Sequence, residues 1–125
     1  ALRQFRMKDF DIPYAYSPVV AGNQTQIEKR KEAYQNFMEA SKKGFEWTAA
    51  HPDESIAILQ KWIPESDASI DLSQSLELSV QHWGDLKEWG LMEPRVIEAF
   101  VNWIQEKGLE RKSFQAQDLF SNTLL

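Results

Sequence analysis

The chain of 125 residues has the length of one domain, or of a part of a larger one. Its apolar fraction of 42%, with five tryptophans, is ample for a core, whereas the net charge of −5 argues against nucleic-acid binding, which needs a clustered basic face. The lack of cysteine excludes disulfides, thiolate nucleophiles and cysteine-ligated zinc or iron–sulfur clusters.

The apolar runs and the first residues of the sequence bear on membrane spans and on the extent of the chain. No apolar run reaches the roughly 20 residues of a membrane-spanning helix. The chain opens at Ala1, without an initiator methionine or a charged segment that leads into an apolar signal. We therefore expect the sequence to be a portion of a longer protein.

The first 23 residues predict one or two short strands. In "LRQFRMKDF" apolar residues alternate with charged ones, as is typical of a strand. Pro13 and Pro18 prevent a helix across "DIPYAYSPVVAGN" and favour extended conformations before them. "SPVV" then predicts a second short strand, which ends at Gly22 and Asn23.

The remainder predicts four helices. The first, within "IEKRKEAYQNFMEASKKGFEWTAAHP", has one apolar face and contains Gly44, where we expect a neighbouring helix to approach closely. Pro52 ends this helix and can open the second, in "ESIAILQKWIP". "LSQSLELSVQHW" predicts the third. The fourth begins at Pro94 and ends before Gly108, which provides a left-handed cap.

The five tryptophans divide into two groups. Trp62 and Trp103 fall near apolar stripes, so we expect both in the core. Trp47, Trp83 and Trp89 lie at helix edges, where a partly buried aromatic ring either seals a junction or stacks on a ligand. Sealing is the favoured interpretation.

No catalytic or metal-binding motif is recognisable. Neither His51 nor His82 has a second histidine or a carboxylate at metal-ligand helical spacing. Phosphate-binding glycine loops and a nucleophile elbow are absent from the sequence. We therefore predict no catalytic residue, no metal site and no cofactor within this chain.

The segment "KDFDIPYAYSP" is the candidate binding site. Prolines stiffen it, so it can present carboxylates and aromatic faces to a cleft at little cost in ordering entropy. The competing interpretation is a crossing strand whose tyrosines pack on their neighbours. The candidate ligand-binding residues are Asp9, Asp11, Tyr14, Tyr16 and Ser17.

Several blocks of the sequence resemble one protein family. The order of "DFDIPYAYSPVVAGN", "ASKKGFEWTAAHPDES", "WGLMEPRVIEAFVNWIQEKGL" and a terminal "LFSNTLL" is similar to the C-terminal part of the family that joins fungal thiamine-pyrimidine synthases to bacterial solute-binding proteins for thiamine-pyrimidine precursors. Nitrate- and sulfonate-binding proteins of ABC importers are more distant relatives.

The resemblance implies a fragment of a two-lobed α/β periplasmic-binding-protein fold of type II. Its fold class would be mostly α with one or two short N-terminal strands. Residues 1–23 would form extended crossing or hinge strands, and residues 24–125 a four-helix C-terminal portion that packs on a lobe. The apolar tail, with Leu119, Phe120, Leu124 and Leu125, would hold the terminus to the body.

The resemblance also separates binding proteins from synthases. The cysteine-rich iron motif of the synthases should fall near Pro13 to Ser17, where this chain reads "PYAYS" without a thiol, which favours plain binding. The acid just ahead of that motif matches Asp9 or Asp11. A carboxylate there would accept hydrogen bonds from an aminopyrimidine, with Tyr14 or Tyr16 stacked on the ring.

The expected function is that of a solute-binding protein for a small heteroaromatic ligand such as a thiamine pyrimidine precursor. It would bind the ligand only together with an N-terminal part, feed an ABC permease, and lie in the periplasm or anchored outside the cytoplasm. One alternative is a cytoplasmic thiamine-pyrimidine synthase-like enzyme, and the other is a helical interaction module without a ligand. We also expect self-association of the chain, through exposed helix faces, and no nucleic-acid partner.

Overall fold

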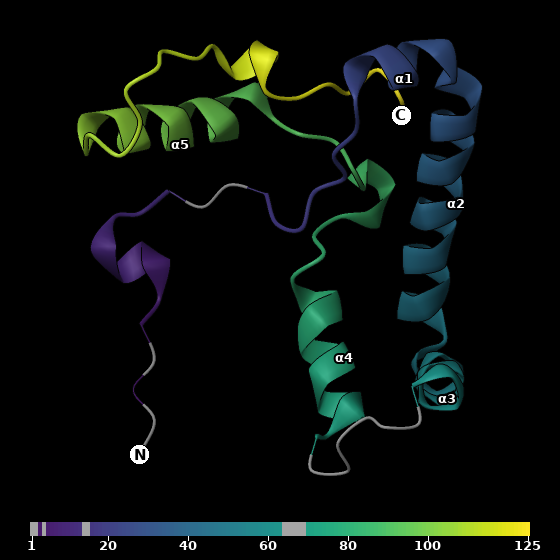
Figure 1. Cartoon of the computed structure of the whole chain (residues 1–125). Helices are drawn as coiled ribbons and strands as arrows, with labels where there is room; N and C mark the ends of the chain where they lie inside the picture. The colour runs from purple at the N-terminus through teal and green to yellow at the C-terminus, as the bar shows by residue number, and fades with distance from the viewer. Residues whose placement is uncertain (1–2, 4, 14–15, 64–69) are drawn as a thin grey trace. The chain divides into compact units, whose positions relative to one another are not determined.

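The computed structural model describes residues 3, 5–13, 16–63 and 70–125, and these residues form helices joined by irregular segments (Figure 1). In chain order the elements are the 3-10 helix η1 (Met7–Phe10), the α-helices α1 (Gln24–Lys29), α2 (Lys31–Ala50), α3 (Pro52–Trp62) and α4 (Leu72–Gln81), the 3-10 helix η2 (Leu86–Glu88), α5 (Pro94–Glu106) and the 3-10 helix η3 (Ala116–Asp118). In this part of the chain, no helix has the length and apolar character that crossing a membrane requires.

The helices divide between two compact units. Unit 1 contains residues 1–29 and 91–124, and therefore η1, α1, α5 and η3; unit 2 contains residues 30–90 with Leu125, and therefore α2, α3, α4 and η2. The predicted boundary after residue 23, between crossing strands and a four-helix portion, concerns an intact two-lobed protein and stays a prediction.

Unit 2 is organised around α3, which contacts both α2 and α4, while η2 contacts α2. Figure 1 views α3 almost along its axis, beside the lower end of α2. Pro52 opens α3, followed by Asp53 and Glu54, where the positive end of the helix dipole favours acids. Asp71 caps α4, since its carboxylate accepts a hydrogen bond of 3.0 Å from the backbone N–H of Gln74. The second and third predicted helices are thus confirmed.

The first predicted helix is wrong in one respect. It is divided into α1 and α2 because Arg30, with φ −130° and ψ 36°, leaves the helical conformation. Gly44 lies inside α2 as predicted, but apart from Gly44, its chain neighbours and the nearby backbone of α2, no described atom lies within 4 Å of the position that a Cβ atom would occupy there. The expected close approach of a neighbouring helix at Gly44 is therefore wrong for the part of the chain that the structure describes.

Unit 1 holds the small core of the described chain. Val101 on α5 and Ala116 on η3 are each 4% exposed, and they are the only buried residues among those described. The end of α5 is confirmed as predicted: Gly108 has φ +66°, and the N–H groups of Gly108 and Leu109 donate to the carbonyls of Gln105 and Ile104. This pair of bonds is a Schellman motif, which satisfies carbonyls at the helix end.

The N-terminal strand predictions are wrong for the described residues. Met7–Phe10 forms η1, followed by Asp11 in the left-handed region at φ 52°, with the N–H of Ile12 donating to Met7 O at 3.2 Å. Val19 and Val20 are both 55% exposed and lie in no strand. A strand satisfies its backbone groups through a neighbour, and none of the described residues forms one. Hydrogen bonds within a local turn take their place at η1.

The core prediction for tryptophan holds only in part. Trp103 is half-buried on α5, where its ring stacks on Phe100 with centroids 6.3 Å apart. Trp62 is 77% exposed at the end of α3, so its assignment to the core is wrong. The helical spacing places Trp62 beside the apolar stripe, but the helices that α3 contacts leave that side uncovered.

Candidate functional site

The structure places the predicted site residues at two locations of unit 1. Asp9 in η1 and Asp11 directly after it are both exposed, and the rings of Phe5 and Phe10 lie beside each other there with centroids 6.0 Å apart. Tyr16 is half-buried, and Ser17 is exposed and precedes Pro18 through a cis peptide bond. Tyr14 lies outside the described residues. The assembly of these five residues into one binding site stays a prediction.

Tyr16 is attached to the beginning of α5. Its hydroxyl oxygen accepts a hydrogen bond of 2.9 Å from the backbone N–H of Glu93, the N-cap residue of α5. This N–H is one of the helix-end donors that lack a partner within the helix. The hydroxyl of Tyr16 thus supplies a capping contact, as in the packing interpretation of the segment.

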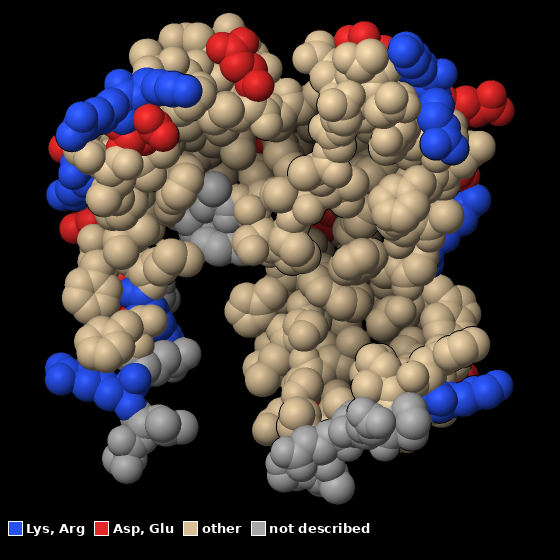
Figure 2. Space-filling model, in the orientation of Figure 1, with Lys and Arg blue, Asp and Glu red and all other residues tan. Residues whose placement is uncertain are grey.

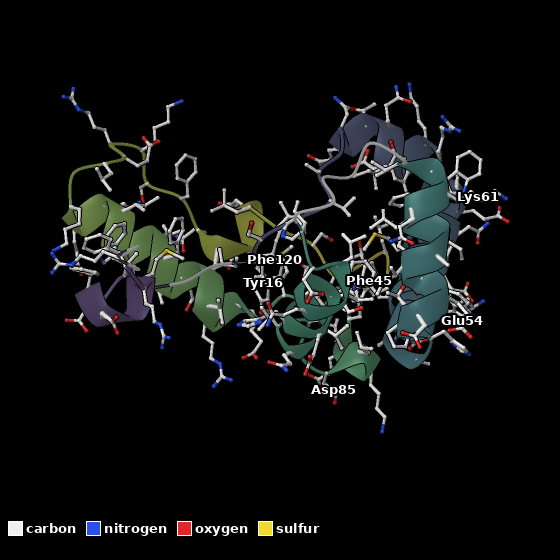
Figure 3. All side chains as sticks on the ribbon, turned by 90° about the horizontal axis from the view of Figure 1, so that it is seen from below. Tyr16, Phe45, Glu54, Lys61, Asp85 and Phe120 are labelled. Atoms are coloured by element: carbon white, nitrogen blue, oxygen red, sulfur yellow. The ribbon has the colours of Figure 1, made fainter. Side chains whose placement is uncertain are left out.

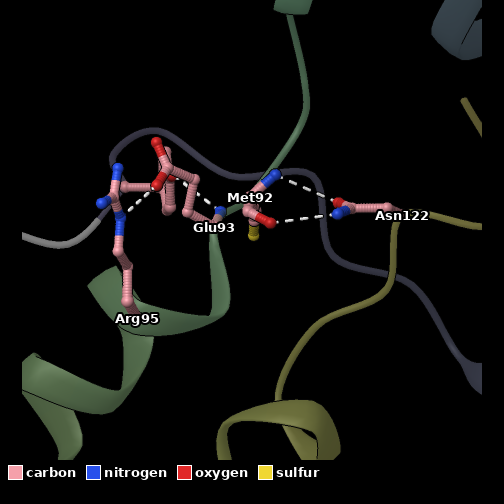
Figure 4. A network of polar contacts seen from close by, with 5 residues as sticks. Met92, Glu93, Arg95 and Asn122 are labelled. Atoms are coloured by element: carbon pink, nitrogen blue, oxygen red, sulfur yellow. Dashed lines mark hydrogen bonds and ion pairs between the residues drawn. The ribbon is translucent and has the colours of Figure 1, made fainter.

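Further polar contacts surround this helix start. The guanidinium Nε of Arg95 donates to the Glu93 carboxylate at 2.5 Å, and this bond together with the charge of Glu93 raises the pKa of Arg95 above its ordinary value. The side-chain amide of Asn122 accepts from the backbone N–H of Met92 and donates to the Met92 carbonyl, both at 3.0 Å (Figure 4). Tyr16 thus contacts Glu93, and Asn122 contacts the preceding residue, Met92, just ahead of the body of α5.

Sequence reasoning missed Asn122, Met92, Glu93 and Arg95. Asn122 is 30 positions from Met92, and Tyr16 is 77 positions from Glu93. A local pattern carries no signal for such pairs. The only hint is the amide side chain of Asn122, in a short polar stretch within the apolar tail, since an amide offers both a donor and an acceptor group.

Unit 2 contains an apolar groove between its helices. Its volume is ≈ 350 Å³, and it is lined by Thr48, Ser55, Ile56, Leu59, Leu72, Ser75, Leu76 and Ser79. The hydroxyls of Ser55 and Ser79 donate to the carbonyls of His51 and Ser75 in their own helices, each at 2.8 Å. None of the described residues that line the groove is ionisable, so these residues are suited to apolar contact. Figure 2 shows the surface over α4 largely free of charged side chains.

Three aromatic rings close another part of unit 2. Phe45 of α2 meets the edge of Trp83 with centroids 4.7 Å apart, and the ring of Trp89 with centroids 5.2 Å apart. Both tryptophans are half-buried. These contacts agree with the sealing interpretation for Trp83 and Trp89, which stays a prediction. Trp47 instead stacks on His51, whose backbone N–H and ring Nδ1 both contact the Trp47 carbonyl at the end of α2.

Comparison with known families gives one match. Residues 1–55 match the family described as NMT1/THI5 like. The matched range covers less than half of the chain, contains η1, α1 and α2, and includes every predicted site residue. The match supports similarity to a superfamily of binding proteins, as the sequence indicates. The resemblance of the later blocks, from Trp89 onward, lies outside the matched range and stays a prediction. A search of curated proteins found no match.

Proposed function

We propose that this chain is the C-terminal portion of a two-lobed solute-binding protein whose ligand is a small heteroaromatic molecule, such as a thiamine pyrimidine precursor. The observation that carries the proposal is the family match over residues 1–55, because it includes the whole candidate segment at residues 9–17. In the intact protein, closure of two lobes of a type II fold would trap the ligand outside the cytoplasm and present it to an ABC permease.

The chemistry of the segment supports binding. Asp9 and Asp11 are exposed acids, so their carboxylates can accept hydrogen bonds from the exocyclic amino group of an aminopyrimidine. The Tyr16 ring is only half-buried and can add a stacking surface. The sequence "PYAYS" lacks the thiols of the synthase iron motif, so the proposal is binding and not synthesis.

The proposal is tested on the intact protein that carries this chain, by calorimetric titration with a formylaminopyrimidine. We expect saturable binding that Asp9→Asn or Asp11→Asn weakens about tenfold or more, because a hydrogen bond to a charged group is lost. Asp118→Asn, which neutralises another acid of unit 1 in η3, is the matched control and should leave the affinity unchanged.

The isolated chain should bind the same pyrimidine without useful affinity, because the opposite lobe would supply half of the site. Micromolar binding to the isolated chain contradicts the two-lobed arrangement. Failure of the intact protein to bind contradicts the ligand class. Pyridoxal phosphate and iron bound by the intact protein would instead establish the synthase alternative.

A further inference from the structure

Helix α3 is apolar on two sides, and its neighbours in unit 2 cover only one of them. Ile56 and Leu59 line the groove with α4. On the other side, Ile58 is 49% exposed and Trp62 is 77% exposed. A large apolar side chain on a helix is normally turned towards a covering partner. This uncovered side therefore has the composition of a contact surface.

Two opposite charges lie on that side. Glu54 and Lys61 are seven residues apart, which is about two helical turns or ~10.5 Å, so they project from the same side of α3. Figure 3 shows them near opposite ends of the helix, both along its outer edge. Both side chains are exposed, and neither has an ion pair or hydrogen bond with any described residue. We call Glu54, Ile58, Lys61 and Trp62 the outward face of α3.

The outward face is complementary to itself. An acid at one end, a base at the other and Ile58 midway between them match the same face turned through 180°. We propose that two copies of this chain associate through the outward faces of their α3 helices, which lie antiparallel. Each Glu54 then lies beside Lys61 of the second copy, and the two Ile58 side chains meet at the two-fold axis, as in an isologous dimer.

The size of the face sets the expected strength of the dimer. Helix α3 has 11 residues, whereas a standard interface uses about 20–30 residues from each partner. The contact is therefore small and its occupancy should depend on concentration. Its anchor is Trp62, because exposed tryptophans that become buried carry much of the energy of such interfaces. The proposed α3 dimer is independent of the heteroaromatic ligand proposed for the segment at residues 9–17.

Sedimentation velocity over a series of concentrations tests the proposal with the 125-residue chain. We expect a monomer–dimer equilibrium in the unmodified chain. Glu54→Lys or Lys61→Glu should raise the dissociation constant about tenfold or more, because each places two like-charge pairs across the interface. The double variant Glu54→Lys/Lys61→Glu should restore the original value. An equimolar mixture of the two single variants should form mixed dimers, because their charges then complement each other.

Control variants distinguish this α3 dimer from non-specific association through other exposed apolar residues. Glu32→Lys makes the same charge change in the first turn of α2, at the far end of a 20-residue helix from α3, and should leave association unchanged. Trp62→Ser should abolish the dimer while circular dichroism shows unchanged helix content, since the side chain is exposed. A chain that stays monomeric, or a dimer that ignores the charge reversals, overturns the proposal; the second result indicates parallel pairing or another surface.

Discussion

Asn122 holds the residues ahead of α5 through two hydrogen bonds that need an amide. Its oxygen accepts from Met92 N–H and its nitrogen donates to the Met92 carbonyl, so the side chain pairs with the backbone as a second peptide group would. The residue is half-buried, so water competes only in part for these bonds. Together with Tyr16 it joins three distant segments of unit 1 at one point.

Replacing Asn122 by Asp should therefore destabilise unit 1. The carboxylate still accepts from Met92 N–H but has no donor. Its second oxygen, which is negatively charged, then faces the partially negative oxygen of the Met92 carbonyl. We expect a loss of about 1–3 kcal/mol in the free energy of unfolding, the cost of leaving such a group without a partner. Urea denaturation measures it.

The matched control is Asn36→Asp on the exposed surface of α2, where the amide has no hydrogen bond with any described residue. It should change the unfolding free energy by less than about 0.5 kcal/mol. Equal effects of the two substitutions would show that the Met92 contact adds no stability.

At the scale of the helices, local signals predicted several boundaries well. Pro52 and Pro94 open α3 and α5, and Gly108 follows the end of α5. These residues act through their own backbone conformation, which depends little on distant contacts. The strand prediction was wrong because alternation only describes which residues could be buried on one face of a sheet. Without a neighbouring strand in the described chain, the same residues form the 3-10 turn η1.

Two glycines of unit 2 test how the local backbone conformation decides whether an added Cβ stabilises the fold. Gly44 in the interior of α2 and Gly84 after α4 both have open space where a Cβ would lie, but Gly84 has φ +71°. Gly44→Ala should raise the free energy of unfolding by about 1 kcal/mol, because alanine favours the helix. Gly84→Ala should lower it by about 1–2 kcal/mol, because the left-handed conformation strains a residue with a Cβ.

Chemical denaturation of both variants compares them in the same background. A destabilising Gly44→Ala would contradict the open environment of that position. It would also restore the expectation that another helix approaches α2 there.

At the scale of the whole molecule, the described chain exposes much of its apolar surface. Val101 and Ala116 are its only buried residues, whereas large apolar side chains such as Phe5, Leu109 and Trp62 are more than 60% exposed. A folded chain of this size normally buries about two-thirds of its surface. Such exposure marks interaction sites in soluble proteins. It agrees with a chain that is covered by a partner, by further polypeptide or by a second copy.

The distribution of burial predicts where the fold is most resistant to opening. Amides of α5 around Val101 should exchange their hydrogens most slowly, since both buried residues lie at its contact with η3. Amides near Trp62 at the end of α3 should exchange fastest among the α-helices of more than eight residues. Hydrogen exchange followed by mass spectrometry measures both, and slower exchange at α3 than at α5 would show that unit 2 holds the stronger core.

The candidate site was predictable only in its composition. The proline-stiffened segment with its acids and tyrosines was evident from residue types, and the family match covers it. The attachment of Tyr16 to Glu93 was not evident, because 77 positions separate them.

The sequence alone was enough to predict the last three helices, the proline and glycine boundaries and the likeness to a family of binding proteins. These follow from short-range periodicity, backbone conformation and local motifs, which neighbouring residues specify. Only the tertiary structure decided that the N-terminal segment forms a 3-10 turn, that Asn122 and Tyr16 meet the start of α5, and that Trp62 is exposed. These outcomes depend on which distant segments come into contact and on which helix faces stay uncovered. A local sequence pattern specifies neither of these.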